Sequence, residues 1–485
     1  MSLKTFAAID VGSFELTMKI FEYSGRNSIR EIDCISRRLE LGSDTYSDGK
    51  ISRDKMDELC RTLSEFGQIM KTYRVEAYKA YGTSAIRETE NTTIVQDQIA
   101  QRTGIRVEIL SNSEQRFLDY KSVALKNLRL GVLRIQEYVN RFAVRHSHME
   151  NFIDEMAMAQ LSNYKKLYLK DREIQNLIVI DDYISPWAVR RTGGDSSRAV
   201  LDRDSFDVFL NQLRTMSPAQ AARTMEIAEE KIPLVFISGV LTSRIAELMG
   251  AKQICVPGVT LCDGMAYEYA ETKNMFRGEH DFEKDIIACA VNISKRYMGS
   301  KKRSETLENI TTTIFAAMKK VHGLDRRELL YLRLAAILHD CGKYISMVNI
   351  GETSYNIIMA TEIIGLSHAE REIVANIVRF NHSKFIYYGQ LGGAGGLDRD
   401  AYLIVAKLTA ILRLASGLDR SHKQKLKGLR AALKEDQLVL TVDTAEDITL
   451  EKGFFEEKGE FFREVFSVEP VLRQRKITQV QMAQK

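Results

Sequence analysis

Three short segments near the N-terminus contain residue types that can bind a phosphate and a metal ion. The first is Asp10-Val11-Gly12-Ser13. Gly12 lets the backbone turn tightly and bring N–H groups close to an anion, and Ser13 adds a hydroxyl donor. Asp10 is placed to hold a hydrated Mg²⁺, which prefers few carboxylates together with phosphate oxygens. Taken alone, such a segment is more often an ordinary hairpin turn.

The second segment is Gly82-Thr83-Ser84-Ala85-Ile86-Arg87, in which small residues end a predicted strand before an arginine. Backbone donors, the hydroxyls of Thr83 and Ser84 and the guanidinium of Arg87 can surround a phosphate. The alternative is a strand-to-helix turn with a surface arginine. The third feature is Glu114, which can orient or deprotonate a water molecule. The alternative for Glu114 is a first-turn glutamate that the helix dipole favours.

The elements that must position these residues alternate between strands and helices, which predicts a mixed α/β sheet. Strands are predicted at 5–24 as a hairpin and at 29–41, 75–81, 107–110, 177–180 and 234–237. Helices are predicted at 52–73, 92–103, 114–123, 203–214, 218–230 and 240–249. From 281 to 422 helices dominate, with a flexible loop at 389–396, and strands are predicted at 437–442 and 448–451.

Composition indicates a soluble globular protein, because 45% of the 485 residues are hydrophobic and 28% are charged. This length suggests roughly three or four domains. No run approaches the ~18 apolar residues of a membrane span, and the N-terminus lacks the apolar core of a signal peptide, so we expect a cytoplasmic protein that binds no membrane. The six cysteines form no CxxC pair, which argues against zinc and disulfides.

The net charge of +4 is too small to indicate binding of a specific nucleic acid. Two local basic clusters are present, and each is either a solvated helix face or a groove for a polyanion. One contains Lys295, Arg296, Lys301, Lys302 and Arg303, and the other contains Lys423, Lys425, Lys427 and Arg430.

In order and spacing, the segments at 8–13, 81–87 and 107–116 resemble the exopolyphosphatase/guanosine pentaphosphate phosphohydrolase family. Further similar stretches lie at 128–135, 236–239, 256–265 and 418–422. The resemblance implies an actin-like (ribonuclease H-like) α/β fold of the ATPase type, with subdomains at 1–120 and 121–275. It also implies an all-α HD-like domain at 276–424, before a small α+β domain at 425–485.

The resemblance implies hydrolysis of the terminal phosphate of inorganic polyphosphate, or of the 5′-phosphate of guanosine pentaphosphate, with Mg²⁺. By matching position, Asp10 would bind Mg²⁺ and Glu114 would activate water, without a covalent intermediate. The phosphate would be bound by Gly12, Ser13, Thr83, Ser84 and Arg87. The length favours polyphosphate, and a homodimer is expected by analogy only. A second hypothesis is a non-catalytic regulator that binds polyphosphate or guanosine tetraphosphate in the same cleft.

The sequence departs from the family where a second glycine-rich turn is expected. Only Lys121–Arg129 stands between Tyr120 and Leu130, which leaves no room for a phosphate-binding hairpin. Either the chain has lost this hairpin, or the sequence lacks a segment that the natural protein has. The loss of two central strands would leave unpaired sheet edges, which favours a missing segment. The continuous numbering favours a deletion. The stretch 180–185 also lacks glycines, and its Asp181 and Asp182 would repel phosphate unless a metal intervened.

His339-Asp340, after an apolar helical run, resembles the HD phosphohydrolase signature, in which both side chains bind a divalent metal. The matching earlier and later ligand positions are Thr306 and Ser416, and two ligands of four would hold a metal poorly. We therefore interpret His339 and Asp340 as a structural relic, and His382 and His422 as surface or packing residues. An HD-type nucleotide phosphohydrolase is the third hypothesis. The domain can also supply a basic channel for a long anion, with affinity that falls steeply with salt.

Overall fold

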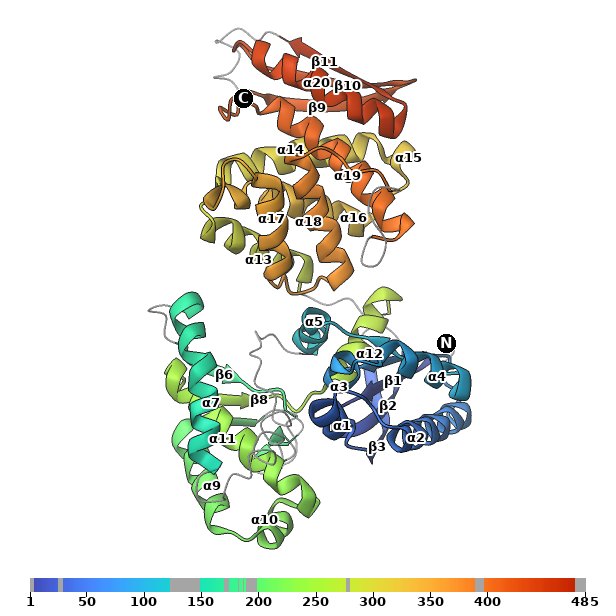
Figure 1. Ribbon diagram of the computed structural model, residues 1–485, viewed down its shortest axis with the longest axis vertical. Helices are drawn as coiled ribbons and strands as arrows, with labels where there is room; N and C mark the ends of the chain where they lie inside the picture. Colours follow the sequence, from blue (N-terminus) through green and yellow to red (C-terminus); the bar gives the residue numbers. More distant parts are fainter. Residues whose placement is uncertain are drawn as a thin grey trace. The chain divides into compact units, whose positions relative to one another are not determined.

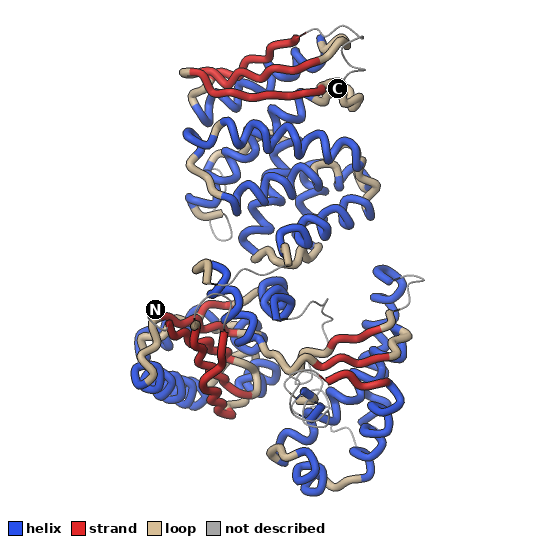
Figure 2. The backbone as a smooth tube through the Cα atoms, turned by 180° about the vertical axis from the view of Figure 1, so that it is seen from behind, coloured by secondary structure: helices blue, strands red, loops and turns tan. Residues whose placement is uncertain are grey.

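The computed structural model describes residues 4–24, 29–122, 149–169, 174–181, 183–185, 187–188, 199–275, 280–388 and 397–475. The chain divides into two compact units, Met1–Glu279 and His280–Lys485. The first unit contains two sheets with helices, and the second contains a helical region followed by a small sheet (Figures 1 and 2). The chain therefore combines mixed sheets with many helices, while the finer division into four domains stays a prediction.

The first sheet of the first unit has five strands in the order β3-β2-β1-β4-β5. Strands β1, β2 and β3 pair antiparallel, whereas β1, β4 and β5 run parallel. The elements are β1 (Lys4–Val11), β2 (Glu15–Tyr23), β3 (Ile29–Arg38), α1 (Leu41–Asp48), α2 (Arg53–Thr72), β4 (Ala77–Gly82), α3 (Ser84–Glu88), α4 (Thr92–Thr103), β5 (Glu108–Ile109) and α5 (Asn112–Ser122). The predicted mixed α/β pattern of this region is confirmed, and α4 has the predicted bounds.

Both faces of the central strand β1 are buried. Successive side chains of the strand point to opposite faces and enter two different cores. Ala7, Ile9 and Val11 of β1 join a core with the apolar side of α2 and α4. Phe6 and Ala8 join a second core with residues of α5 and of α12 (Leu261–Thr272). The central strand β1 is therefore held between two helical layers, which fixes the turn that follows it.

The second sheet has the strand order β6-β8-β7 and is flanked by helices. Its elements are α7 (Met149–Tyr164), η2 (Lys165–Leu169), β6 (Asn176–Ile178), β7 (Ala199–Asp202), α9 (Arg203–Thr215), α10 (Pro218–Met225), η3 (Glu229–Lys231), α11 (Ile232–Met249) and β8 (Gln253–Val256). The strand predicted at 234–237 is wrong, since these residues lie in α11. A short apolar run does not distinguish a buried strand from a buried helix, and Pro233 in the first turn is the helical signal.

The second unit begins with helices and ends with a three-stranded sheet in the order β11-β10-β9. Its elements are α13 (Phe282–Arg296), α14 (Lys301–Ala317), α15 (Lys319–His322), α16 (Arg326–Leu338), η4 (Cys341–Tyr344), α17 (Ile350–Ala360), α18 (His368–His382), α19 (Arg399–Leu418), β9 (Lys427–Lys434), β10 (Gln437–Asp443), α20 (Thr449–Phe466) and β11 (Glu469–Arg475). The strand predicted at 448–451 is wrong, because α20 begins there and buries Phe455, Phe462 and Phe466 at helical spacing. The loop predicted at 389–396 lies outside the described residues.

Two helices are long and apolar enough to cross a membrane, Glu229–Met249 and Arg399–Leu418. In each, 61% of the most apolar stretch is buried inside the structure. Helix α11 packs on α7 and α9, and α19 packs on α18 and α20. Core helices of soluble proteins share this length, composition and burial, so the two helices are weak evidence for a membrane span.

Candidate functional site

The three predicted phosphate-site segments lie along one edge of the five-stranded sheet. In the parallel ladders, Val11 lies opposite Gly82, and Gly82 lies opposite Ile109. The carboxyl ends of β1, β4 and β5 are therefore level, and open α/β sheets bind ligands at that edge. Asp10, Ser13 and Ser84 stand at this edge, and Glu114 follows it at the start of α5.

The turn between β1 and β2 depends on Gly12. The Gly12 amide donates to the Glu15 carbonyl at 3.2 Å. A Cβ atom added at Gly12 would lie 2.7 Å from that same carbonyl oxygen, so any other residue would force the turn open. The predicted tight turn is present, and it places Ser13 directly after the end of β1.

Hydroxyl groups from two of the segments meet beside this turn. The Ser13 Oγ is 2.8 Å from the Ser84 Oγ and 3.2 Å from the Tyr46 Oη. The Thr83 hydroxyl instead donates to the Val11 carbonyl at 3.4 Å, so it links β4 to β1. Three hydroxyls from different elements therefore gather at one point, which suits recognition of a phosphate oxygen.

Tyr46 is the member of this cluster that the sequence did not reveal. It lies on α1, a short helix without a predicted counterpart, which approaches Ser13 closely at Gly42. The Gly42 amide donates to the Ser13 carbonyl at 2.8 Å. The segment is polar and has no apolar periodicity, so the contact is visible only in the folded chain.

The Tyr46→Phe variant is expected to raise the KM for a phosphate-containing substrate about 2- to 10-fold, the effect of one hydrogen bond of about 0.5–1.5 kcal/mol. The fold should be unchanged, because only the hydroxyl is removed. Tyr73→Phe is the matched control, since the Tyr73 hydroxyl bonds Asp33 at 2.7 Å on the exposed surface. Steady-state kinetics of wild type and both variants test this expectation. Equal KM values for wild type and Tyr46→Phe would show that Tyr46 does not bind the substrate.

Arg87 and Glu114 come together at the start of α5, but both are engaged in local contacts. The Arg87 Nη1 donates to the Leu110 carbonyl at 2.7 Å and to the Gln115 Oε1 at 3.3 Å. The Ser111 amide donates to the Glu114 Oε2 at 2.9 Å, while the Glu114 amide donates to the Ser111 Oγ at 3.2 Å. Glu114 therefore forms a reciprocal helix cap with Ser111 in the first turn of α5.

The residues at the sheet edge fit a Mg²⁺ ion that is held mainly by substrate. Asp10 is partly buried and supplies one carboxylate near the end of β1. Within the described ranges, no three His, Cys, Asp or Glu side chains gather as a ready-made metal site. Mg²⁺ commonly binds through one or two carboxylates, waters and substrate phosphates, so a single carboxylate is sufficient.

Helix α12 fixes both the sheet and α5. Asp263 caps the helix through the Thr260 amide at 2.8 Å and accepts the Lys19 Nζ at 3.0 Å. Burial acts to lower the pKa of Lys19, but Asp263 and Glu31 raise the pKa overall and keep the ammonium charged. A Cβ atom added at Gly264 would lie 2.2 Å from the Leu118 carbonyl oxygen of α5, so this glycine permits the close contact.

The part of the predicted phosphate site that follows α5 in the sequence is described only in part. The Asp181 carboxylate accepts the Ser238 hydroxyl at 2.8 Å and the Tyr183 and Ile184 amides at 2.7 and 2.6 Å. Burial raises the pKa of Asp181 despite these hydrogen bonds, and both carboxylate oxygens already accept hydrogen bonds from neighbouring residues. Asp182 and the residues after Ser122 where the second glycine-rich turn was expected lie outside the described residues.

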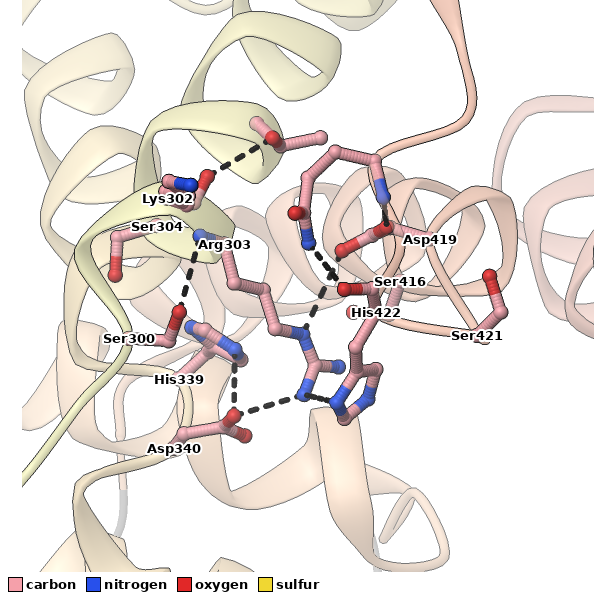
Figure 3. A network of polar contacts seen from close by, with 12 residues as sticks. Ser300, Lys302, Arg303, Ser304, His339, Asp340, Ser416, Asp419, Ser421 and His422 are labelled. Atoms are coloured by element: carbon pink, nitrogen blue, oxygen red, sulfur yellow. Dashed lines mark hydrogen bonds and ion pairs between the residues drawn. The ribbon is translucent and has the colours of Figure 1, made fainter.

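The two residues matched to the other HD ligand positions make local contacts. Thr306 donates to the Lys302 carbonyl in its own helix at 2.9 Å, and Ser416 donates to Asn381 at 3.0 Å. The groups that surround His339 and Asp340 are instead Arg303 and Lys343, with Asp419 on the other side of Arg303 (Figure 3). Burial opposes ionisation of Asp340, but His339, Arg303 and Lys343 lower the pKa of its carboxyl well below the usual range.

His382 makes the second unit sensitive to acid. Its Nε2 lies 2.7 Å from the His339 carbonyl oxygen, and burial lowers the pKa of His382 to about 4. Because the unfolded histidine has a pKa of about 6.5, protonation between these values favours unfolding. We therefore expect the stabilisation that neutral His382 provides to be fully present above about pH 6.5 and to decrease as the pH is lowered toward 4.

We expect His382→Gln to flatten this pH dependence, because the amide can still donate to the carbonyl but does not titrate. Urea unfolding at several pH values between 4 and 7 measures the effect as the difference between wild type and variant. The titration of the carboxylates contributes equally to the stability of both proteins, so it cancels in that difference. Parallel curves for the two proteins would contradict the assignment.

The basic clusters are smaller than the sequence suggested. Arg303 is buried, with 5% of its surface exposed, so it is not part of a surface patch. Lys425 pairs with the buried Glu451 at 3.1 Å, and Arg430 pairs with Asp443 at 3.0 Å. The side chain of Lys427 lies outside the described residues. Among the described members of the two clusters, the exposed cations are Lys295, Arg296, Lys301, Lys302, Lys423 and Arg430.

Comparison with known proteins gives two family matches and several relatives. Residues 23–127 match the model of the Ppx/GppA phosphatase family, and residues 288–458 match Ppx/GppA phosphatase, domain III. Two curated relatives carry the name guanosine-5′-triphosphate,3′-diphosphate pyrophosphatase. The one from Vibrio atlanticus is 21% identical over 84% of this chain and 86% of its own length. The one from Vibrio cholerae is 19% identical over 91% of this chain and 93% of its own.

A solved structure of an exopolyphosphatase from Cytophaga hutchinsonii matches 56% of this chain and 98% of its own chain, with 17% identity and a TM-score of 0.49. The first family model includes Thr83, Arg87 and Glu114, and the second covers most of the helical unit. The chain belongs to the Ppx/GppA phosphatase family.

Proposed function

We propose that this protein is a phosphohydrolase that releases the terminal phosphate of inorganic polyphosphate or the 5′-phosphate of guanosine pentaphosphate. The observation that carries the proposal is the contact between Ser13 and Ser84, 2.8 Å apart, where the carboxyl ends of β1 and β4 meet. It joins two segments that are 71 positions apart into one hydroxyl-lined edge. The curated relatives named as guanosine-5′-triphosphate,3′-diphosphate pyrophosphatases support the same class of reaction.

In the proposed mechanism the Gly12 turn and the hydroxyls of Ser13 and Ser84 bind the terminal phosphate. Arg87 has one of two roles. It moves from the Leu110 carbonyl to bind the phosphate, or it stays bonded to Leu110 and so positions α5. Asp10 would hold Mg²⁺, which neutralises the charge of the phosphate oxygens when it is bound. Positioning and charge neutralisation suffice for phosphoryl transfer to water, so no covalent intermediate is needed.

Glu114 is proposed to orient the attacking water. The Ser111 amide at 2.9 Å holds the Oε2 atom, so we assign the Oε1 atom to the water. A carboxylate whose position is fixed by its own helix can accept a proton without rearrangement of the backbone. The helix cap and the catalytic role are therefore compatible in one side chain.

The finer architecture belongs to the same proposal. We propose that the first unit is the actin-like pair of subdomains, that the helices of the second unit form an HD-like domain, and that β9–β11 with α20 form the small α+β domain. The sheet order of the first unit, with an antiparallel hairpin beside parallel strands, supports the first assignment. The His339-Asp340 pair after α16 supports the second.

A second candidate function is a non-catalytic regulator that binds polyphosphate or guanosine tetraphosphate. The observation that favours it is the engagement of Glu114 and Arg87 in contacts with Ser111 and Leu110. If these contacts persist with ligand bound, the site recognises phosphate without activating water. The two candidates share the binding surface and differ only in turnover.

Product analysis tests the proposed reaction. The full chain with Mg²⁺ is incubated with end-labelled polyphosphate and, separately, with guanosine pentaphosphate. We expect phosphate to leave one unit at a time from the chain end, and guanosine tetraphosphate to form from guanosine pentaphosphate. Internal polyphosphate fragments, or loss of the 3′-diphosphate, would contradict the assignment.

A further inference from the structure

The helical unit contains a buried cluster of charged side chains that the proposed reaction does not use. His339 and Asp340 follow α16, Arg303 lies in the first turn of α14, and Asp419 caps the end of α19 (Figure 3). Only 5% of Arg303, 1% of His339 and 2% of Asp419 is exposed, and 9% of Asp340. Charges so deeply buried need partners, so their arrangement shows which cation the site contains.

The guanidinium of Arg303 lies between the two carboxylates. Its Nη1 is 2.8 Å from the Asp340 Oδ2, and its Nε is 3.9 Å from the Asp419 Oδ2. His422 adds its Nδ1 at 3.3 Å from the same Nη1. The Nζ of Lys343, whose side chain is more exposed than that of Arg303, also lies 2.9 Å from the Asp340 Oδ2. Two cations thus balance two carboxylates.

The side chains of His339 and Asp340 lie against each other beside Arg303. The Nδ1 of His339 lies 2.8 Å from the Ala336 carbonyl oxygen, which can only accept, so Nδ1 donates to it. The other ring nitrogen, Nε2, faces Asp340. That Nε2 is 3.0 Å from the Asp340 Oδ2. Among the described residues, the His339 Nε2, the Asp340 Oδ1 and the Asp419 Oδ2 are buried without a hydrogen-bond partner.

These residues do not fit a divalent metal as they stand. No three metal-binding side chains converge in the part of the chain that the structure describes. Arg303 separates Asp340 from Asp419, and a guanidinium cannot lose its charge in a protein. A divalent ion beside it would be strongly repelled at this distance in a buried setting.

We propose that Arg303 is the permanent cation of an HD-type centre and occupies the position that a divalent metal would take between Asp340 and Asp419. The helical unit is then held together by a guanidinium instead of a metal and needs no metal for stability. Removal of the guanidinium should leave a latent metal site made of His339, Asp340 and Asp419. This inference is independent of the reaction proposed for the first unit.

The test is the thermal stability and metal content of the full chain with Arg303→Ala, with and without millimolar Mn²⁺. Loss of the guanidinium leaves a buried carboxylate uncompensated, so we expect the Tm to fall by roughly 10 °C. Mn²⁺ should restore at least half of that loss and remain bound at one ion per chain above the wild-type level after dialysis. Wild type should show no Tm change with Mn²⁺.

Arg327→Ala is the matched control. Arg327 pairs with Glu370 at 2.7 Å in the same unit, but next to one carboxylate and no histidine. Its loss should lower the Tm without any recovery in Mn²⁺. If Arg303→Ala does not fold in either condition, Arg303→His, which supplies a further ligand, replaces it in the same assay. The proposal is wrong if neither Arg303 variant retains more Mn²⁺ than wild type after dialysis, or if Mn²⁺ restores the Tm of Arg327→Ala as well.

Discussion

Replacing Glu114 by glutamine is expected to lower the turnover number for phosphate release by roughly 10²- to 10⁴-fold, the usual contribution of a general base. Glutamine keeps the helix cap, because its side-chain oxygen can still accept the Ser111 amide that Glu114 accepts at 2.9 Å. It loses only the negative charge and the ability to take a proton. The loss should therefore appear in kcat, with the binding of polyphosphate and the Tm unchanged.

Glu114→Gln is preferred to Glu114→Ala, because alanine would also remove the cap and cost about 1 kcal/mol. Glu328→Gln is the control, since Glu328 forms the same kind of cap with the Asp325 amide at 2.7 Å in the second unit. That variant should keep full activity. Equal rates for wild type and Glu114→Gln would refute the role assigned to Glu114.

The second large effect is expected at Gly264, where α12 meets α5. A methyl group at this position would lie 2.2 Å from the Leu118 carbonyl oxygen and 2.7 Å from its carbonyl carbon. Both contacts involve backbone, which cannot move aside as a flexible side chain can. We expect Gly264→Ala to lower the free energy of unfolding by about 3 kcal/mol, at the upper end of overpacking.

Displacement of α5 should also lower phosphate release, because α5 positions both Glu114 and the Leu110–Gln115 contacts of Arg87. Gly67→Ala is the control within the same unit, since the nearest atom to an added Cβ lies 4.0 Å away in a helix interior. Alanine there should be neutral or stabilising by up to about 1 kcal/mol. Urea unfolding and amide hydrogen exchange of α5 measure the difference, and equal protection in both variants would contradict the close contact.

Much of the first unit could be predicted from local sequence. Gly12 signalled a tight turn, apolar residues at helical spacing signalled α2, and strand-helix alternation signalled the mixed sheet. The positions of Asp10, Ser13, Ser84 and Glu114 at one edge follow from the parallel pairing of β1, β4 and β5. This strand pairing is implied by the family resemblance. It cannot be predicted from the periodicity of the sequence.

Other features depend on contacts between distant residues and could not be predicted. Tyr46 enters the site through a short polar helix that packs on Ser13. The apolar run at 234–237 was assigned to a strand, because its helical context becomes clear only over the 18 residues of α11. Arg303 was counted with exposed lysines, although it is the buried partner of Asp340. Charge in a sequence does not tell whether a side chain meets solvent or an internal carboxylate.

The most direct test of the central claim is the initial rate of inorganic phosphate release by the purified full chain. It is measured with polyphosphate and with guanosine pentaphosphate, with Mg²⁺ and after its removal by a chelator. The account predicts steady release from at least one of the two substrates, dependent on Mg²⁺. Binding of both substrates without any release of phosphate would contradict the proposed hydrolysis and favour the non-catalytic regulator.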